Sequence, residues 1–309
     1  MATSKNFFED YIPKFSPSEM FEEFSDLIFL ASGNFTNIFL TTDKHTNGKM
    51  VLKCARKEAT KKDEFQREFY YNKMLNPHPN ITMCFGDVFE ICGYYVFAQE
   101  LAAAGDLSEL LTRGALEERQ VWYIAEQLSF ALEYMDDKGL VHCNVCLENI
   151  LVFHAETCRV KLNDFGRTTQ KGSVVKSLCL QDSWAPPEVR RVSPPYEETY
   201  HAHPSLDAWH LTILLIVCLT GSYPWCAADI TDTVYSSWLA WTWRKAFTLP
   251  SIFKHFTPRF LCLLKRLLEP NPKKRISVKK IHKYVGDSWL KKGSDLPSTD
   301  MTLSAKLIR

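Results

Sequence analysis

The pattern of hydrophobic and polar positions changes character about a third of the way along this chain of 309 residues. In the first third, short runs rich in β-branched and aromatic residues alternate with turn-forming residues. These runs cover residues 27–40, 50–54, 81–89 and 94–101. The pattern predicts the strands of an antiparallel sheet.

One helical pattern, residues 62–75, interrupts these strands and ends before the prolines of Asn76-Pro-His-Pro, which cannot continue a helix. From Leu107 onward, apolar residues recur at helical spacing. We expect helices over residues 117–138, 208–220, 234–244 and 258–268. The change near residues 102–105 predicts two lobes joined by a short hinge.

Both ends of the chain lack a firm pattern and are expected to be tails, over residues 1–24 and 291–309. Between them lies one domain, residues 25–290, with an N-lobe over 25–101 and a C-lobe over 102–290. The longest apolar run, residues 211–219, is too short to span a membrane and predicts a buried helix.

Composition then excludes several classes of partner. Lysine and arginine total 37 against 36 acidic residues, so no overall field attracts nucleic acid or an anionic membrane, and we expect neither as a partner. The N-terminal residues lack the apolar core of a signal peptide. Ten scattered cysteines in a chain of this size favour a reducing, cytoplasmic location.

Phosphoryl transfer requires a flexible cover over the phosphates, a lysine, metal-binding oxygens and a carboxylate that orients the acceptor. The segment LASGNFTNI, residues 30–38, resembles the glycine-rich loop of kinases, although only Gly33 is retained where further glycines are expected, with Ala31 and Thr36 in their places. From this segment alone, an ordinary hairpin turn is an equally good interpretation.

Lys53 ends the apolar run MVLK, and Glu68 follows fifteen residues later on the predicted helix. Singly, each would be interpreted as a solvated surface charge. Their spacing, with HPNI at residues 78–81, is similar to that of the kinase lysine and its paired glutamate. We expect an ion pair between them.

The most specific segment is LVHCNVCLENIL, residues 140–151, in which His142 and Asn149 match the kinase catalytic loop. Fifteen residues after Asn149, the segment VKLNDFG supplies the metal-binding aspartate, Asp164. Farther on, APPE at residues 185–188 resembles the kinase A-P-E element, with Arg275 as a partner for Glu188, and DAW at 207–209 resembles the aspartate that braces the catalytic loop.

Seven such segments in the right order identify the chain as similar to the protein kinase family over residues 25–290, with a proline-rich insertion before Leu206. It most resembles the SH3-domain-binding serine/threonine kinases, although no P-x-x-P motif supports binding to an SH3 domain. The resemblance implies an α+β, bilobal protein-kinase fold: a small β-rich N-lobe with one main helix and a larger, mostly helical C-lobe.

The resemblance also implies ATP and Mg²⁺ as cofactors and a protein substrate or signalling partner. It would place Leu30, Gly33 and Ile38 around the nucleotide, Lys53 on its phosphates, and Asn149 and Asp164 on the metal. Gln99 would lie at the back of the adenine pocket, with the backbone of Glu100 and Ala102 holding adenine.

Three residues of the catalytic loop depart from the family pattern. Asn144 stands where the acceptor-binding aspartate belongs, and an amide does not accept a proton at neutral pH. Cys146 and Cys143 replace a lysine and an arginine. The sequence therefore predicts a pseudokinase-like binding module that retains ATP and magnesium; the alternative is an active serine/threonine kinase in which Asn144 orients the acceptor hydroxyl.

Two motifs have rival interpretations. Cys143-x-x-Cys146 could be a redox pair or half of a zinc site, but it lacks a second ligand pair, and we favour unreactive filler side chains. Trp238, Trp241 and Trp243 could form a partner surface, but aromatic residues at this spacing more often pack in a helical core.

Overall fold

The computed structural model describes residues 11–33, 35–176, 183–190 and 199–293, which form two compact units. Unit 1 comprises the chain up to Ala103 together with Asn163–Thr168, and unit 2 comprises Ala104–Leu162 and the chain from Thr169 onward. Asn34, part of the expected proline-rich insertion before Leu206 (residues 191–198), residues 1–10 of the expected N-terminal tail and most of the expected C-terminal tail lie outside the described residues.

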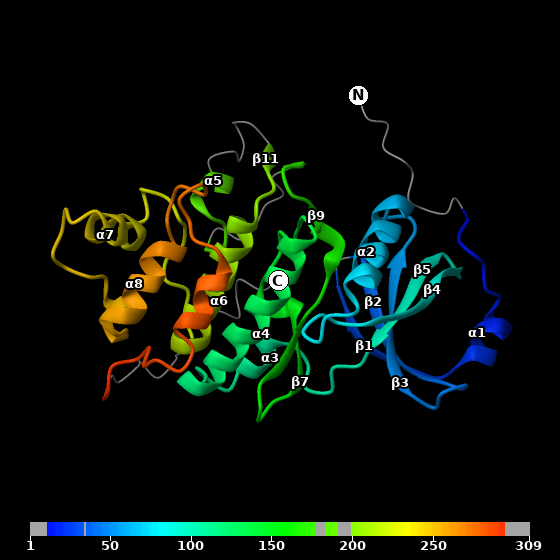
Figure 1. The fold of residues 1–309 in the computed structure, drawn as a ribbon. Coiled ribbons are helices and arrows are strands. Elements are labelled where there is room, and N and C mark those ends of the chain that lie inside the picture. Colours follow the sequence, from blue (N-terminus) through cyan, green and yellow to red (C-terminus); the bar gives the residue numbers. More distant parts are fainter. Residues whose placement is uncertain (1–10, 34, 177–182, 191–198, 294–309) are drawn as a thin grey trace. The chain divides into compact units, whose positions relative to one another are not determined.

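Unit 1 is built on a five-stranded antiparallel sheet in the order β1-β2-β3-β5-β4 (Figure 1). The helix α2 (Lys62–Leu75) lies against it, with Phe65 and Phe69 packed on Phe97 at centroid distances of 5.2 and 5.4 Å. The predicted helix therefore has the predicted limits. The strands are β1 (Phe24–Ser32), β2 (Thr36–Asp43), β3 (Lys49–Arg56), β4 (Cys84–Ile91) and β5 (Tyr94–Glu100).

The part of the expected N-terminal tail that the structure describes is ordered. Ser16 and Glu19 form a reciprocal capping box that starts the short helix α1 (Pro17–Glu23). The Phe15 ring stacks on Phe89 of β4 at 4.6 Å, and the Phe15 N–H donates to the Glu90 carbonyl. These long-range contacts hold the segment before β1 against the sheet. The local sequence pattern could not predict them.

Unit 2 is mostly helical, as expected, and its centre is α6 (Pro204–Thr220), in which nearly every residue is buried. The helix begins four residues before the expected start because Pro204 occupies its first turn and the His203 side chain caps it. Among the described helices, none combines the length and apolarity needed to cross a bilayer.

The other elements of unit 2 are the helices α3 (Leu107–Leu111), α4 (Glu118–Asp137), α5 (Pro187–Arg190), α7 (Thr233–Thr242) and α8 (Pro258–Leu267). Its short strands pair as β6 (Leu140–Val141) with β9 (Thr169–Gln170), β7 (Ile150–His154) with β8 (Arg159–Leu162), and β10 (Val174–Lys176) with β11 (Thr199–His201). Single 3₁₀ turns are η1 (Leu147–Asn149), η3 (Ser251–His255) and η4 (Val278–Lys283) in unit 2 and η2 (Phe165–Arg167) in unit 1.

The tryptophans of α7 divide between the two interpretations that the sequence left open. Trp238 is fully buried and stacks on Phe253 at 4.2 Å, which makes it a core residue. Trp241 is partly buried and stacks on Trp238. Trp243, just beyond the helix, is 54% exposed, so the core interpretation is wrong for this residue.

Candidate functional site

Unit 1 brings together the charged side chains of Lys53, Glu68 and Asp164. The Lys53 ammonium donates to Asp164 Oδ1 at 3.0 Å and also contacts Glu68 Oε1. The side chains of Lys53 and Glu68 are 11% and 10% exposed, whereas that of Asp164 is 33% exposed. The result is a largely buried cation between two carboxylates, one of which solvent reaches.

Three separate elements hold these side chains. Lys53 lies on the central strand β3, where its backbone pairs with Ile38 on one side and Phe97 on the other. Glu68 lies on α2 between the two phenylalanines that pack this helix on the sheet. The expected ion pair therefore forms because helix packing directs Glu68 at the central strand.

Asp164 directly precedes η2 and has left-handed backbone angles, φ 62° and ψ 84°. This conformation is strained for residues other than glycine, although aspartate tolerates it better than most. Strained backbone of this kind persists only where its surroundings hold it in place, and here the ion pair with Lys53 does so.

The electrostatics of the triad follow from its burial. Burial alone would lower the pKa of Lys53, but the carboxylates of Asp164 and Glu68 outweigh it and raise that pKa, so the ammonium stays charged. Burial raises the pKa of Glu68 against the opposing pull of Lys53. A firmly charged lysine beside an accessible carboxylate is a donor set suited to polyphosphate and a divalent cation.

The residues expected around the nucleotide base and the covering loop lie in the same unit. Ile38 pairs with Lys53 in the β2–β3 ladder, Leu30 on β1 is 46% exposed, and the Gly33 N–H donates to the Thr36 carbonyl at 2.7 Å. Gln99 and Glu100 end β5, and Ala102 follows that strand.

Gln99 has partners that sequence reasoning missed. Its side chain is 4% exposed and donates to the amide oxygens of Asn72 and Asn163, at 2.8 and 3.2 Å. The only available signal was position: Asn72 follows Glu68 by one helical turn, and Asn163 directly precedes Asp164. No spacing rule linked them to Gln99.

In unit 2, the segment with the strongest kinase resemblance is held by Asp207. The two oxygens of this buried carboxylate accept from the N–H groups of His142 and Cys143, at 2.8 and 2.9 Å. Cys143 has a positive φ of 65°, which the paired acceptors fix. Burial raises the pKa of Asp207 to about 7, despite the two donors, which oppose this rise.

Asn144 and Asn149 are joined within the same loop. Asn149 donates from Nδ2 to the Asn144 carbonyl at 2.9 Å, and the Asn144 N–H donates to His142 Nδ1 at 3.2 Å. These bonds fix the backbone on which the Asn144 amide stands in place of a carboxylate. Asn149 can still offer its side-chain oxygen to a cation.

The two cysteines of this loop, Cys143 and Cys146, are not joined in a disulfide, and Cys143 is buried. Across the described residues, no group of three or more histidine, cysteine, aspartate or glutamate side chains is arranged to hold a metal ion. The interpretation of the two cysteines as unreactive filler side chains stays a prediction.

Glu188 and Arg275 form the ion pair that the sequence indicated. Two guanidinium nitrogens of Arg275 donate to the two Glu188 oxygens at 2.7 and 2.8 Å, and Arg275 also donates to the carbonyl oxygens of Ser205 and Glu269. The Arg275 side chain is completely buried. The pair joins α5 to the start of α6 and to the chain beyond α8.

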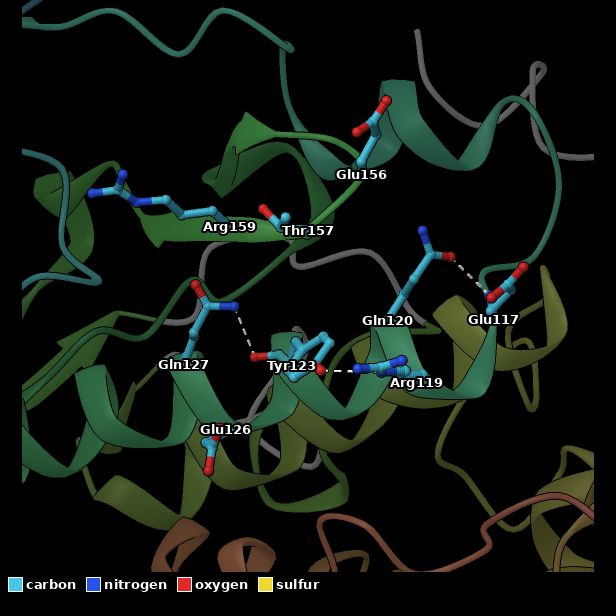
Figure 2. A pocket seen from close by; sticks show the side chains of 9 residues that line it. All are labelled: Glu117, Arg119, Gln120, Tyr123, Glu126, Gln127, Glu156, Thr157 and Arg159. Atoms are coloured by element: carbon cyan, nitrogen blue, oxygen red, sulfur yellow. Dashed lines mark hydrogen bonds between the residues drawn. The ribbon is translucent and has the colours of Figure 1, made fainter.

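A cavity of about 730 Å³ lies elsewhere in unit 2, between α4 and the turn that joins β7 to β8 (Figure 2). Its charged side chains have both signs, and Arg119 donates to the Tyr123 hydroxyl at 3.0 Å. It contains none of the residues expected to bind nucleotide or metal. The lining residues are Glu117, Arg119, Gln120, Tyr123, Glu126, Gln127, Glu156, Thr157 and Arg159.

Comparison with known proteins gives a consistent result. The protein kinase domain family matches residues 24–289. The serine/threonine-protein kinase meng-po of Drosophila melanogaster is 38% identical over 84% of this chain and 57% of its own length. The serine/threonine-protein kinase SBK1 of Danio rerio is 35% identical, with 86% and 69% covered, and SBK2 of Rattus norvegicus is 31% identical, with 88% and 76% covered.

The chain thus spans little more than half of the Drosophila protein, and the match falls on both described units. The sheet with α2 packed on it, the Lys53–Glu68 pair and the loop braced by Asp207 all lie within the matched residues. On the combined evidence of its motifs, its fold and its relatives, the chain belongs to the protein kinase family and is similar to the SBK serine/threonine kinases.

Proposed function

We propose that this chain binds ATP with Mg²⁺ and is impaired in transferring the γ-phosphate, so that it acts in signalling chiefly as a nucleotide-responsive binding module. The observation that carries the first part is the position of Lys53 between Glu68 and Asp164. Burying a cation between two carboxylates has a desolvation cost, and a cluster whose pKa values are shifted by burial and charge is a candidate functional site.

The donor set fits a magnesium nucleotide. Lys53 would contact the phosphates, and Asp164 and Asn149 would supply oxygen ligands for the metal, the ligand type that Mg²⁺ prefers. When bound, the metal would neutralise charge on the phosphate oxygens. Leu30, Gly33, Ile38, Gln99, Glu100 and Ala102 are the proposed contacts of the remainder of the nucleotide.

The impairment rests on the loop that holds Asn144. An amide hydrogen-bonds an acceptor hydroxyl but does not take its proton, and loss of a general base typically costs about 10²- to 10⁴-fold in rate. Cys146 supplies no positive charge toward the transferring group. Replacing a carboxylate by an amide leaves nucleotide binding intact because it removes a repulsion from the phosphates.

An active serine/threonine kinase is the second candidate, favoured by the names of the relatives. In that case Asn144 would orient the acceptor hydroxyl, which is sufficient if the transition state is loose. The γ-phosphate would then be transferred to the hydroxyl of a serine or threonine side chain in a protein substrate. The ten scattered cysteines of the sequence are the basis for proposing a cytoplasmic location for either candidate.

A thermal melt of the purified chain, with ATP alone, Mg²⁺ alone and both together, tests the binding proposal. We expect Tm to rise by several degrees with millimolar ATP and Mg²⁺, and the rise to disappear in Asp164→Ala. Asp87→Ala, which removes an exposed carboxylate of unit 1 paired with Lys73, is the matched control and should keep the shift. An unchanged Tm in the wild type would refute nucleotide binding.

A further inference from the structure

A layer of neutral amides lies beside the charged triad of unit 1. Gln99 Nε2 donates to Asn72 Oδ1 at 2.8 Å and to Asn163 Oδ1 at 3.2 Å, and Asn72 Nδ2 donates to the Thr82 carbonyl at 2.5 Å. Asn72 is fully buried and Gln99 nearly so. We name Asn72, Gln99 and Asn163 the amide layer.

Each residue of the amide layer lies close to a residue of the charged triad, either along the chain or on a neighbouring strand. Asn72 follows Glu68 by four residues on α2, which places both on one face of the helix. Asn163 directly precedes Asp164. Gln99 pairs with Val51, two residues before Lys53 on β3, so the two side chains leave the same face of the sheet on neighbouring strands.

Apolar contacts and buried hydrogen bonds both hold α2, but they differ in how precisely they fix the position of the helix. Phe65 and Phe69 pack on the sheet through apolar contacts, which tolerate small slides and rotations. Hydrogen bonds between buried amides are directional, and moving α2 by a fraction of a turn would leave Gln99 and Asn72 buried without partners. Only one register of the helix satisfies the layer.

We propose that the amide layer is the positioning device that holds α2 in the register at which Glu68 meets Lys53, and that it holds Asp164 beside them through Asn163. The inference rests on the proposed binding of a magnesium nucleotide for its functional consequence. The layer carries no charge, so it fixes the geometry of the triad without altering the charges that the triad presents.

Hydrogen exchange of the α2 amides and the Kd for ATP with Mg²⁺, both measured on Gln99→Met, test the proposal. This near-isosteric change removes the central donor, and we expect about tenfold faster exchange of α2 and about tenfold weaker nucleotide binding, relative to the wild type. Gln99→Glu replaces the donor by a carboxylate oxygen, which only accepts, opposite the amide oxygens of Asn72 and Asn163. It should also speed α2 exchange and weaken nucleotide binding. Asn163→Ala, a milder change, should do so to a smaller extent and serves if the others fail to fold.

Gln127→Met is the matched control, because Gln127 of α4 also links three backbone groups. It donates to the Tyr123 carbonyl (Figure 2) and to the Cys158 carbonyl, and it accepts from the Val160 N–H. It should lower Tm while leaving α2 exchange and Kd unchanged. If Gln99→Met lowers Tm alone, with α2 exchanging as in the wild type, the amide layer is merely structural and the proposal is overturned. The exchange result stands even if the wild type binds no nucleotide, so the two proposals fail separately.

Discussion

Lys53 donates to Asp164 at 3.0 Å although the two residues are 111 positions apart in the chain. The contact ties the central strand of unit 1 to a short segment, Asn163–Thr168, that belongs to the same compact unit but is distant from it in sequence. Because Glu68 contacts the same ammonium, a single lysine joins strand β3, helix α2 and the turn at Asp164. The triad is therefore a structural support as well as the proposed phosphate contact.

Replacing Lys53 by methionine tests both roles. The change leaves the buried Glu68 carboxylate and the partly exposed Asp164 carboxylate facing each other without a cation, and we expect a loss of about 3 kcal/mol in the free energy of unfolding. The rise in Tm with ATP and Mg²⁺ should also vanish. Urea unfolding measures the first effect and a thermal melt the second.

The control for this change is Lys57→Met, which removes a lysine of the same unit that pairs with Glu90 at 2.6 Å and is 32% exposed. A partly exposed pair of this kind contributes little to stability, so the loss should be much smaller, and nucleotide binding should persist. If Lys53→Met and Lys57→Met lower the free energy of unfolding equally, the triad does not stabilise the fold more than an ordinary surface ion pair.

Glu188→Gln should destabilise unit 2 strongly. The variant leaves the guanidinium of Arg275, whose side chain is completely buried, with a neutral partner, and breaking a buried pair in this way costs about 3–5 kcal/mol. Asp287→Asn removes the carboxylate that pairs with Arg259, a side chain that is 63% exposed, and should have a much smaller effect on stability. Urea unfolding measures the free energy of unfolding of both variants. Similar losses would contradict the prediction that the buried pair of Glu188 and Arg275 is the more important one.

The ionisation of Asp207 should make the free energy of unfolding depend on pH. Because the pKa of this carboxyl is about 7 in the folded chain, well above its ordinary value, folding takes up a proton between about pH 4 and 7. The unfolded state binds fewer protons in this window, so stability falls as pH rises, by up to about 1.4 kcal/mol per pH unit from this group.

Asp207→Asn removes the titrating group, and its free energy of unfolding should vary less steeply between pH 4.5 and 7 than that of the wild type. The comparison uses slopes, since the amide also loses one of the two N–H acceptors and lowers stability at every pH. Parallel slopes in urea titrations of the two proteins would mean that Asp207 ionises normally in the folded state.

The order found at the N-terminal end of unit 1 leads to another prediction. Phe15→Ala removes the ring stacked on Phe89 and should lower the free energy of unfolding by about 2 kcal/mol, because a partly buried aromatic contact is lost. Tyr11→Ala, at a side chain 72% exposed, should change it by less than about 0.5 kcal/mol. An unaffected Tm in Phe15→Ala would mean that this segment does not support the sheet.

Local periodicity and motif spacing were enough to predict α2 and the Lys53–Glu68 pair, because a helix of fixed length and a family spacing both act over few residues. They could not predict the packing of residues 11–23, whose α1 is only seven residues long and is fixed by contacts with β4. The amide layer was missed for the same reason, since its bonds join residues 27 and 64 positions apart. Trp243 was misjudged because helical periodicity does not indicate where a helix ends.

The measurement that tests the central claim most directly is the rate of γ-phosphate transfer to a general acceptor protein such as casein, for the wild type and for the double variant Asn144→Asp with Cys146→Lys. With the proposed nucleotide bound, restoring the carboxylate and the cation should raise the rate by about 10²-fold or more over a barely detectable wild type. Wild-type transfer as fast as that of the double variant, and abolished by Asp164→Ala, would contradict the claim that Asn144 impairs catalysis.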